Sequence, residues 1–174
     1  REDPTLRRER GSLYAFTMQG LYAVGVAGVG FGIARAMLAE FIALASRKAP
    51  RGLARLADNA VVQADVARAE ARLGSARAYL IETLATIYAN ADDVAPIDVV
   101  DRGRVRLACA NAIQAATEVV DFAYKSAGVD AIFPGPFERR FRDMHTLSQQ
   151  IQARSAHFEQ VGQILLGAPP EEFF

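Results

Sequence analysis

An all-α fold, arranged as an up-down-up-down four-helix bundle, is predicted by two features of this 174-residue sequence. Alanine is the most frequent residue, and it has the best helix propensity of all. The seven prolines leave four long stretches without proline, and a proline inside a helix costs roughly 3 kcal/mol. Each stretch is long enough for one helix, and 51% hydrophobic residues suffice for a core packed between four helices.

Two helices are predicted in the first half of the chain. The first runs from about Ser12, a suitable N-cap, to Ser46 or Arg47, and Pro50 marks the break after it. The second occupies roughly 53–90. Apolar residues recur along it with nearly heptad spacing and are expected to face the core: Val62, Val66, Ala69, Leu73, Ala76, Leu80 and Ile87.

Two more helices are predicted in the second half. The third spans Val99–Ala127 and ends at Gly128, because glycine adopts the left-handed conformation that commonly closes a helix. The segment 133–136 predicts a turn, after which a fourth helix runs from about Phe137 to Leu166. The side of this helix expected to face inward carries Phe137, Phe141, Met144, Ser148, Ile151, Phe158 and Leu165.

The predicted helices form one domain over residues 12–168. Residues 1–11 are charged and lack apolar periodicity, so they are interpreted as a leader or as the stub of an upstream domain. Residues 169–174 form a short tail. The leader lacks the basic start, apolar stretch and cleavage site of a signal peptide, and we expect a cytoplasmic protein.

The first helix raises the question of a membrane span, because residues 12–34 contain no charged side chain. Against a span, polar Thr17 and Gln19 interrupt the run, and Arg35 and Glu40 follow on the same helix. A helix that is apolar all round can instead be buried between its own bundle and a neighbouring subunit. We therefore expect a dimer or tetramer rather than a membrane protein.

Composition argues against several other classes. The 20 basic and 20 acidic residues give a net charge of zero, so no basic surface for nucleic acid is expected. Cys109 is the single cysteine and there are only two histidines, which predicts neither a disulfide nor a metal site. The glycine-rich segment 28–32 lacks the third glycine of a dinucleotide-binding loop, so close helix packing is the preferred interpretation.

Two segments resemble one known family. Residues 21–47 form a small-residue helix that contains Gly-Ile-Ala and then alanines ending at an arginine; this resembles the first helix of the acyl-CoA dehydrogenase C-terminal domain. Residues 137–145, Phe-Glu-Arg-Arg-Phe-Arg-Asp-Met-His, resemble the Glu-Arg-x-x-Arg-Asp segment of that superfamily. The histidine two residues after the aspartate is similar to the branch containing two-component flavin-dependent monooxygenases. The resemblance covers about 12–167.

The resemblance implies that this bundle is one of three domains of a flavoenzyme. The FAD or FMN would be shared with the other domains and with a neighbouring subunit. Arg47 matches an arginine that reaches the cofactor pyrophosphate, and Ser126, Ala127 and Gly128 match a loop whose backbone approaches the cofactor. The residues themselves leave two other interpretations open: a helix-end arginine interacting with the helix dipole, and an ordinary glycine helix stop.

For catalysis, the resemblance points to His145 and Gln150. Many dehydrogenases of the family carry a catalytic carboxylate eight residues after the Arg-Asp aspartate, but this position is Ile151, which cannot accept a proton. The monooxygenase branch often has a histidine one residue earlier; Gln150 there can hydrogen-bond to a flavin but cannot act as an acid or base near pH 7. His145 also has a structural interpretation, and Arg142 and Asp143 are expected to form a buried or interface ion pair.

These matches favour flavin-dependent hydroxylation over dehydrogenation. A partner flavin reductase would then deliver reduced flavin, and the bundle would keep water away from the oxygen chemistry. Two alternatives stay open: an acyl-CoA dehydrogenase proper, and a non-catalytic helical module that self-associates through the glycines of the first helix. The substrate is not predicted, because in this superfamily much of its pocket lies in the other domains.

Overall fold

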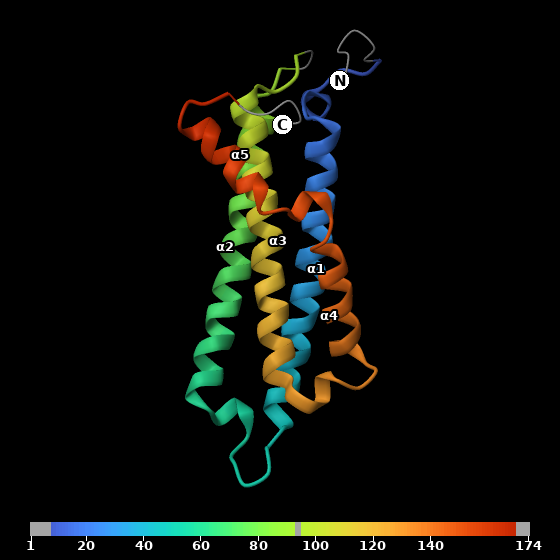
Figure 1. The fold of residues 1–174 in the computed structure, drawn as a ribbon, viewed down its shortest axis with the longest axis vertical. Coiled ribbons are helices and arrows are strands. Elements are labelled where there is room, and N and C mark those ends of the chain that lie inside the picture. Colours follow the sequence, from blue (N-terminus) through green and yellow to red (C-terminus); the bar gives the residue numbers. More distant parts are fainter. Residues whose placement is uncertain (1–7, 93–94, 170–174) are drawn as a thin grey trace.

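The computed structural model describes residues 8–92 and 95–169, and every regular element within these ranges is helical. Three long helices lie side by side, each antiparallel to the next in sequence, and two shorter ones complete the bundle (Figure 1). This arrangement confirms the all-α prediction, with the fourth helix divided in two. The helices are α1 (Met18–Arg47), α2 (Ala60–Asn90), α3 (Val99–Ala127), α4 (Pro136–Leu147) and α5 (Ala156–Leu165).

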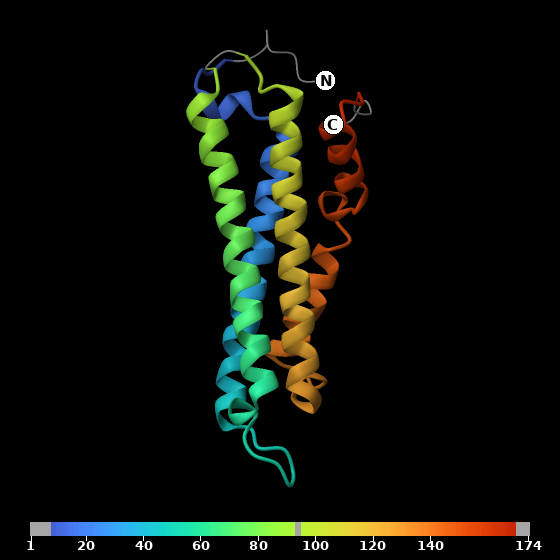
Figure 2. The same cartoon turned by 90° about the vertical axis from the view of Figure 1, so that its left-hand side faces the viewer.

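The division of the fourth helix corrects the prediction of one helix from Phe137 to Leu166. The chain leaves α4 after Leu147, forms one 3₁₀ turn at Ile151–Ala153, crosses α3 and begins α5 (Figures 1 and 2). As a result, the row predicted to face inward fails beyond Ser148: Ile151 is 58% exposed and Leu165 is 72% exposed. Beyond Ser148 the buried side chains are Gln152, His157 and Val161, and the two polar ones form hydrogen bonds that hold the break.

The first two helices begin later than predicted, because nearer capping residues define their starts. Thr17 caps α1 by accepting a hydrogen bond from the Gly20 amide at 3.0 Å, and a separate 3₁₀ turn occupies Ser12–Ala15. Asn59 caps α2 by accepting from the Val61 amide at 2.8 Å. Helix α3 has the predicted bounds, and Gly128 follows it with a φ of 63°.

Helix α3 is central and contacts all four other helices, and α1 packs against α3, α4 and α2. Phe41 on the buried side of α1 has no exposed surface, and its ring meets Phe122 of α3 edge to face with centroids 5.3 Å apart. The small residues of α3 let the two helices approach closely: Ala108, Cys109, Ala112, Ala116 and Ala123, all fully buried.

By length and composition alone, α1 could cross a membrane. A helix in the core of a folded bundle has the same composition. Helix α1 packs against three other helices on one side, and less than half of its most apolar stretch is buried within the single chain.

The predictions for the two chain ends lie largely outside the described residues. Of the predicted leader, residues 8–11 are described and form no helix. Of the predicted tail, only Pro169 is described.

Candidate functional site

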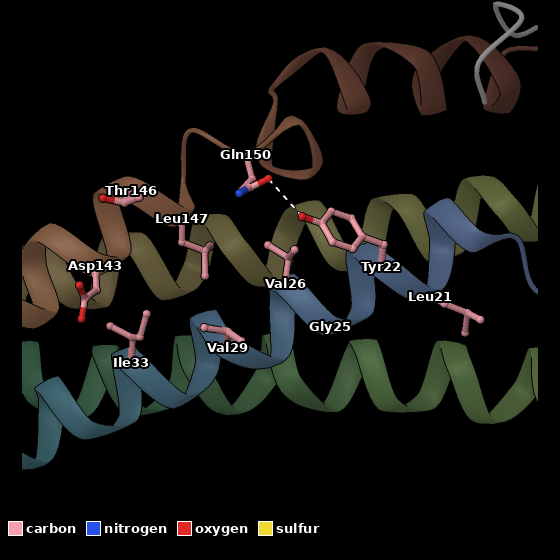
Figure 3. A pocket seen from close by; sticks show the side chains of 10 residues that line it. All are labelled: Leu21, Tyr22, Gly25, Val26, Val29, Ile33, Asp143, Thr146, Leu147 and Gln150. Carbon is pink, nitrogen blue, oxygen red and sulfur yellow. Dashed lines mark hydrogen bonds between the residues drawn. The ribbon is translucent and has the colours of Figure 1, made fainter.

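An open groove of about 840 Å³ lies between α1 and α4 (Figure 3). One wall is apolar and comes from α1, where Gly25 leaves space beside the valines. The other wall comes from α4 and the loop after it, and it adds a few polar groups to a largely hydrocarbon surface. A concave apolar surface with few polar groups is typical of a binding site for a small organic molecule. The lining residues are Leu21, Tyr22, Gly25, Val26, Val29, Ile33, Asp143, Thr146, Leu147 and Gln150.

Gln150 lines this groove from the loop that follows α4. Its carboxamide lies beside Tyr22, whose hydroxyl donates a hydrogen bond to the Gln150 Oε1 at 3.4 Å (Figure 3). The amide group of glutamine both donates and accepts. Since Tyr22 faces the accepting oxygen, the Nε2 group remains available to donate a hydrogen bond to a molecule in the groove.

His145 lies on a different side of α4 and is not part of the groove lining. Its Nε2 pairs with Asp121 Oδ1 of α3 at 2.8 Å, and its ring packs on Phe141 with centroids 4.2 Å apart. Through this hydrogen bond, His145 links α4 to α3 and has a structural role.

The prediction that Arg142 and Asp143 form an ion pair is wrong. Arg142 instead pairs with Glu138 at 3.6 Å, and Asp143 pairs with Arg139 at 3.7 Å, each one helical turn away. All of these pairs are partly solvent-exposed, so they contribute little to the stability of the fold.

The residues matched to cofactor binding gather at the other end of α1. Arg47 is the last residue of that helix and is exposed, while Ser126, Ala127 and Gly128 end α3 nearby. Lys48 connects the two helix ends, because its Nζ donates to the Ala127 carbonyl at 2.6 Å and also pairs with the carboxylate of Asp130. The hydrogen bond from Lys48 lowers the pKa of Asp130.

Within one chain the two sets of predicted residues are far apart. Tyr22 lies near the start of α1 and Arg47 at its end, so about 37 Å of helix separates them at about 1.5 Å per residue. Gln150 and the Arg47 region therefore cannot contact the same part of one ligand. Sequence reasoning missed Tyr22, Lys48 and Asp121; of these, only Lys48 could have been suggested, by its position beside Arg47.

The described residues offer neither a metal site nor a reactive thiol. No group of three or more His, Cys, Asp or Glu side chains within residues 8–92 and 95–169 could hold a metal ion. Cys109 is fully buried in α3, and this burial raises the pKa of its thiol to about 12.

We expect Cys109 to be unreactive in the folded protein. The thiolate is the nucleophilic form, so burial and the raised pKa should slow alkylation at pH 8 roughly a thousandfold relative to the unfolded chain. Iodoacetamide labelling with peptide mass spectrometry, with and without denaturant, measures this ratio. Equal labelling in both conditions would show that Cys109 is accessible and contradict the prediction.

Comparisons with known proteins agree with the fold and the resemblance. The family model described as "Acyl-CoA dehydrogenase, C-terminal domain" matches residues 24–155. Indole-3-acetate monooxygenase of Pseudomonas putida is 34% identical over 146 residues, which cover 82% of this chain and 37% of that protein. The chain thus spans little more than a third of this relative's length.

Solved structures show the same fold. XiaF from Streptomyces sp., in complex with FADH2 and glycerol, has a TM-score of 0.78 at 20% identity; the match covers 87% of this chain and 39% of XiaF. The HsaA monooxygenase from M. tuberculosis has a TM-score of 0.76 at 20% identity, covering 88% and 39%. Because the family model matches most of the residues from α1 to the loop before α5, the chain belongs to the acyl-CoA dehydrogenase C-terminal domain family.

Proposed function

We propose that this chain is the C-terminal, flavin-contacting and oligomer-forming domain of a flavin-dependent monooxygenase. The observation that carries the proposal is the apolar groove between α1 and α4, with the Gln150 amide at its edge. Once another domain or subunit covers it, an apolar groove can keep water from an oxygen reaction, and one amide donor can orient a polar group of a mostly hydrocarbon substrate. The similarity to indole-3-acetate monooxygenase suggests a small aromatic acid as the substrate.

The flavin, FAD or FMN, would be held partly by this chain. When bound, reduced flavin would supply the two electrons that split molecular oxygen into one atom for the substrate and one molecule of water. The exposed guanidinium of Arg47 suits a phosphate group. Gly128 is exposed, has a φ of 63° and has no side chain, so a ligand could approach its own backbone, whereas Ala127 is buried and its carbonyl accepts from Lys48. Lys48 already neutralises the end of α3 there.

One observation favours the alternative function, an acyl-CoA dehydrogenase. Asp143 lines the same groove, and a carboxylate is the group that would abstract a proton next to a thioester. The position expected for that carboxylate is Ile151, which cannot do so. Asp143 is also partly engaged with Arg139. Hydroxylation is therefore the preferred assignment.

The proposed partners are further copies of this chain, in a dimer or tetramer, and a flavin reductase that delivers reduced flavin. The outward glycines Gly28 and Gly32 of α1 support self-association, because a Cβ built on either meets nothing within 4 Å in one chain. We propose a cytoplasmic location for the assembled enzyme, without membrane or nucleic acid partners.

We expect the protein that includes the upstream domains to hydroxylate indole-3-acetate when given reduced FAD and oxygen. With ¹⁸O₂, mass spectrometry should find one ¹⁸O atom in the product. In the control, oxidised flavoprotein is mixed with a series of acyl-CoAs without oxygen. Bleaching of the flavin there, with no ¹⁸O product, would reject hydroxylation and establish the dehydrogenase.

A further inference from the structure

The loop between α4 and α5, residues 148–155, places Gln150 at the groove, and its backbone is held on both sides of that residue. The Gln150 amide donates to the Leu147 carbonyl at 3.0 Å, and its carbonyl accepts from the Ala153 amide at 2.9 Å. The carbonyl of the next residue, Ile151, accepts from the Nε2 of the buried His157 at 2.7 Å. The loop therefore has a defined shape, but these bonds reach only from the last residue of α4 to α5.

One contact fixes the loop to the rest of the bundle through a buried charge. Arg106 of α3 is only 9% exposed, and its guanidinium donates a hydrogen bond to the side-chain oxygen of Gln152, which is 5% exposed. Burial lowers the pKa of Arg106. None of the ion pairs formed among residues 8–92 and 95–169 includes Arg106, so a neutral amide is the side-chain acceptor for this cation.

Burying a cation opposite a neutral amide stabilises the contact between two elements less than apolar packing would, because the cation loses its hydration. Taking a guanidinium out of water costs several kcal/mol, and replacement of buried charged groups by well-packed apolar ones is often neutral or stabilising. What the polar pair adds over an apolar contact is direction, because a hydrogen bond to a charged donor fixes distance and angle while apolar packing tolerates sliding. The geometry of the pair therefore matters more than its contribution to stability.

We propose that Arg106 is a positioning residue: by binding Gln152, it fixes the loop 148–155 on α3 so that the Gln150 carboxamide stays at the groove beside Tyr22. Gln152 lies two residues after Gln150, so sliding of the loop along α3 would carry Gln150 away from its place. This inference rests on the proposed function only for the role of Gln150 in the reaction. The anchoring of the loop is independent of it.

The test replaces both members of the pair by apolar residues of similar size, in the protein that includes the upstream domains. Arg106→Met with Gln152→Leu leaves no buried polar group without a partner, so the global unfolding transition should change little. Amide hydrogen exchange in residues 148–155 of the flavin-free protein should nevertheless rise roughly tenfold, because the directional anchor is lost. Arg104→Met, an exposed change on the same helix, is the matched control and should leave that exchange unchanged.

A double-mutant cycle then tests whether Arg106 acts through Gln150. Product formed per reduced flavin should fall in the double apolar variant, but it should not fall further when Gln150→Ala is already present. Unchanged exchange in 148–155 would overturn the anchoring, and a full additional loss in the Gln150→Ala background would overturn the positioning of Gln150. If exchange rises in a protein that hydroxylates nothing, the proposed function fails while the anchor is supported.

Discussion

Replacing Gln150 with alanine in the complete enzyme is expected to uncouple oxygen use from product formation. Gln150 lies at the edge of the groove with its Nε2 free to donate, and its neighbour Tyr22 holds the other side of the amide. Loss of one neutral hydrogen bond near the reacting groups should lower product per reduced flavin by roughly tenfold. The missing product should appear as hydrogen peroxide, since both atoms of oxygen are then reduced without transfer. Product and peroxide measured in the same reaction give the coupling directly.

Gln149→Ala provides the matched control for this change. Gln149 is an exposed glutamine next in sequence, and it does not line the groove. Both variants should unfold within about 0.5 kcal/mol of the unchanged protein, because each replaces an exposed polar side chain. If both variants formed as much product per reduced flavin as the unchanged protein, Gln150 would have no role in the reaction. Equal loss in both would show that the loop tolerates no change, and would also contradict a specific role.

The parts of the fold that could be predicted are those with local signals. Helix α3 has its predicted bounds because an aspartate caps its start and a glycine ends it: the Asp98 carboxylate accepts from the Asp101 amide at 2.8 Å, and Gly128 has a positive φ. The starts of α1 and α2 were placed too early for a related reason. Several residues near each start can cap a helix, and only Thr17 and Asn59 do so.

The break in the fourth helix could not be predicted, because its cause lies elsewhere in the sequence. Apolar spacing favours a continuous helix through Ser148 and Ile151, and no proline or glycine interrupts 137–161. The break is held by Arg106, 46 residues before Gln152 in the sequence. A buried arginine on an alanine-rich helix gives no sign of its partner until the structure brings the two together.

The candidate site was predicted in part for the same reason. The family resemblance singled out Gln150 by its position after the Arg-Asp pair, and in the structure this residue lines a groove. Its neighbour Tyr22 lies 128 positions away in the sequence, and the partner of His145 is Asp121 on another helix. Such pairs depend on how the helices cross, which local patterns do not encode.

Replacing Gly28 with leucine is expected to dissociate the proposed oligomer while leaving the folded chain intact. A Cβ at Gly28 meets nothing within 4 Å in the single chain, so the fold itself has room for a larger side chain. If a second copy covers this face of α1, leucine overpacks the contact and weakens association by about 1–3 kcal/mol, or roughly 5- to 150-fold in the dissociation constant. Sedimentation at micromolar concentration measures the shift from dimer or tetramer to monomer.

Gly30→Leu distinguishes this effect from damage to the fold. A Cβ at Gly30 would lie 3.6 Å from Ala116 Cβ and 3.6 Å from Met144 Cε, so the additional atoms of leucine have no space inside the bundle. We expect Gly30→Leu to lower the free energy of unfolding by about 1–3 kcal/mol, and Gly28→Leu not to lower the thermal midpoint when both proteins are compared as monomers. A wild-type protein that sediments as a stable monomer at micromolar concentration would reject the assembly. So would a Gly28→Leu variant that associates as tightly as wild type, because the outward glycines would then lie outside any contact between copies.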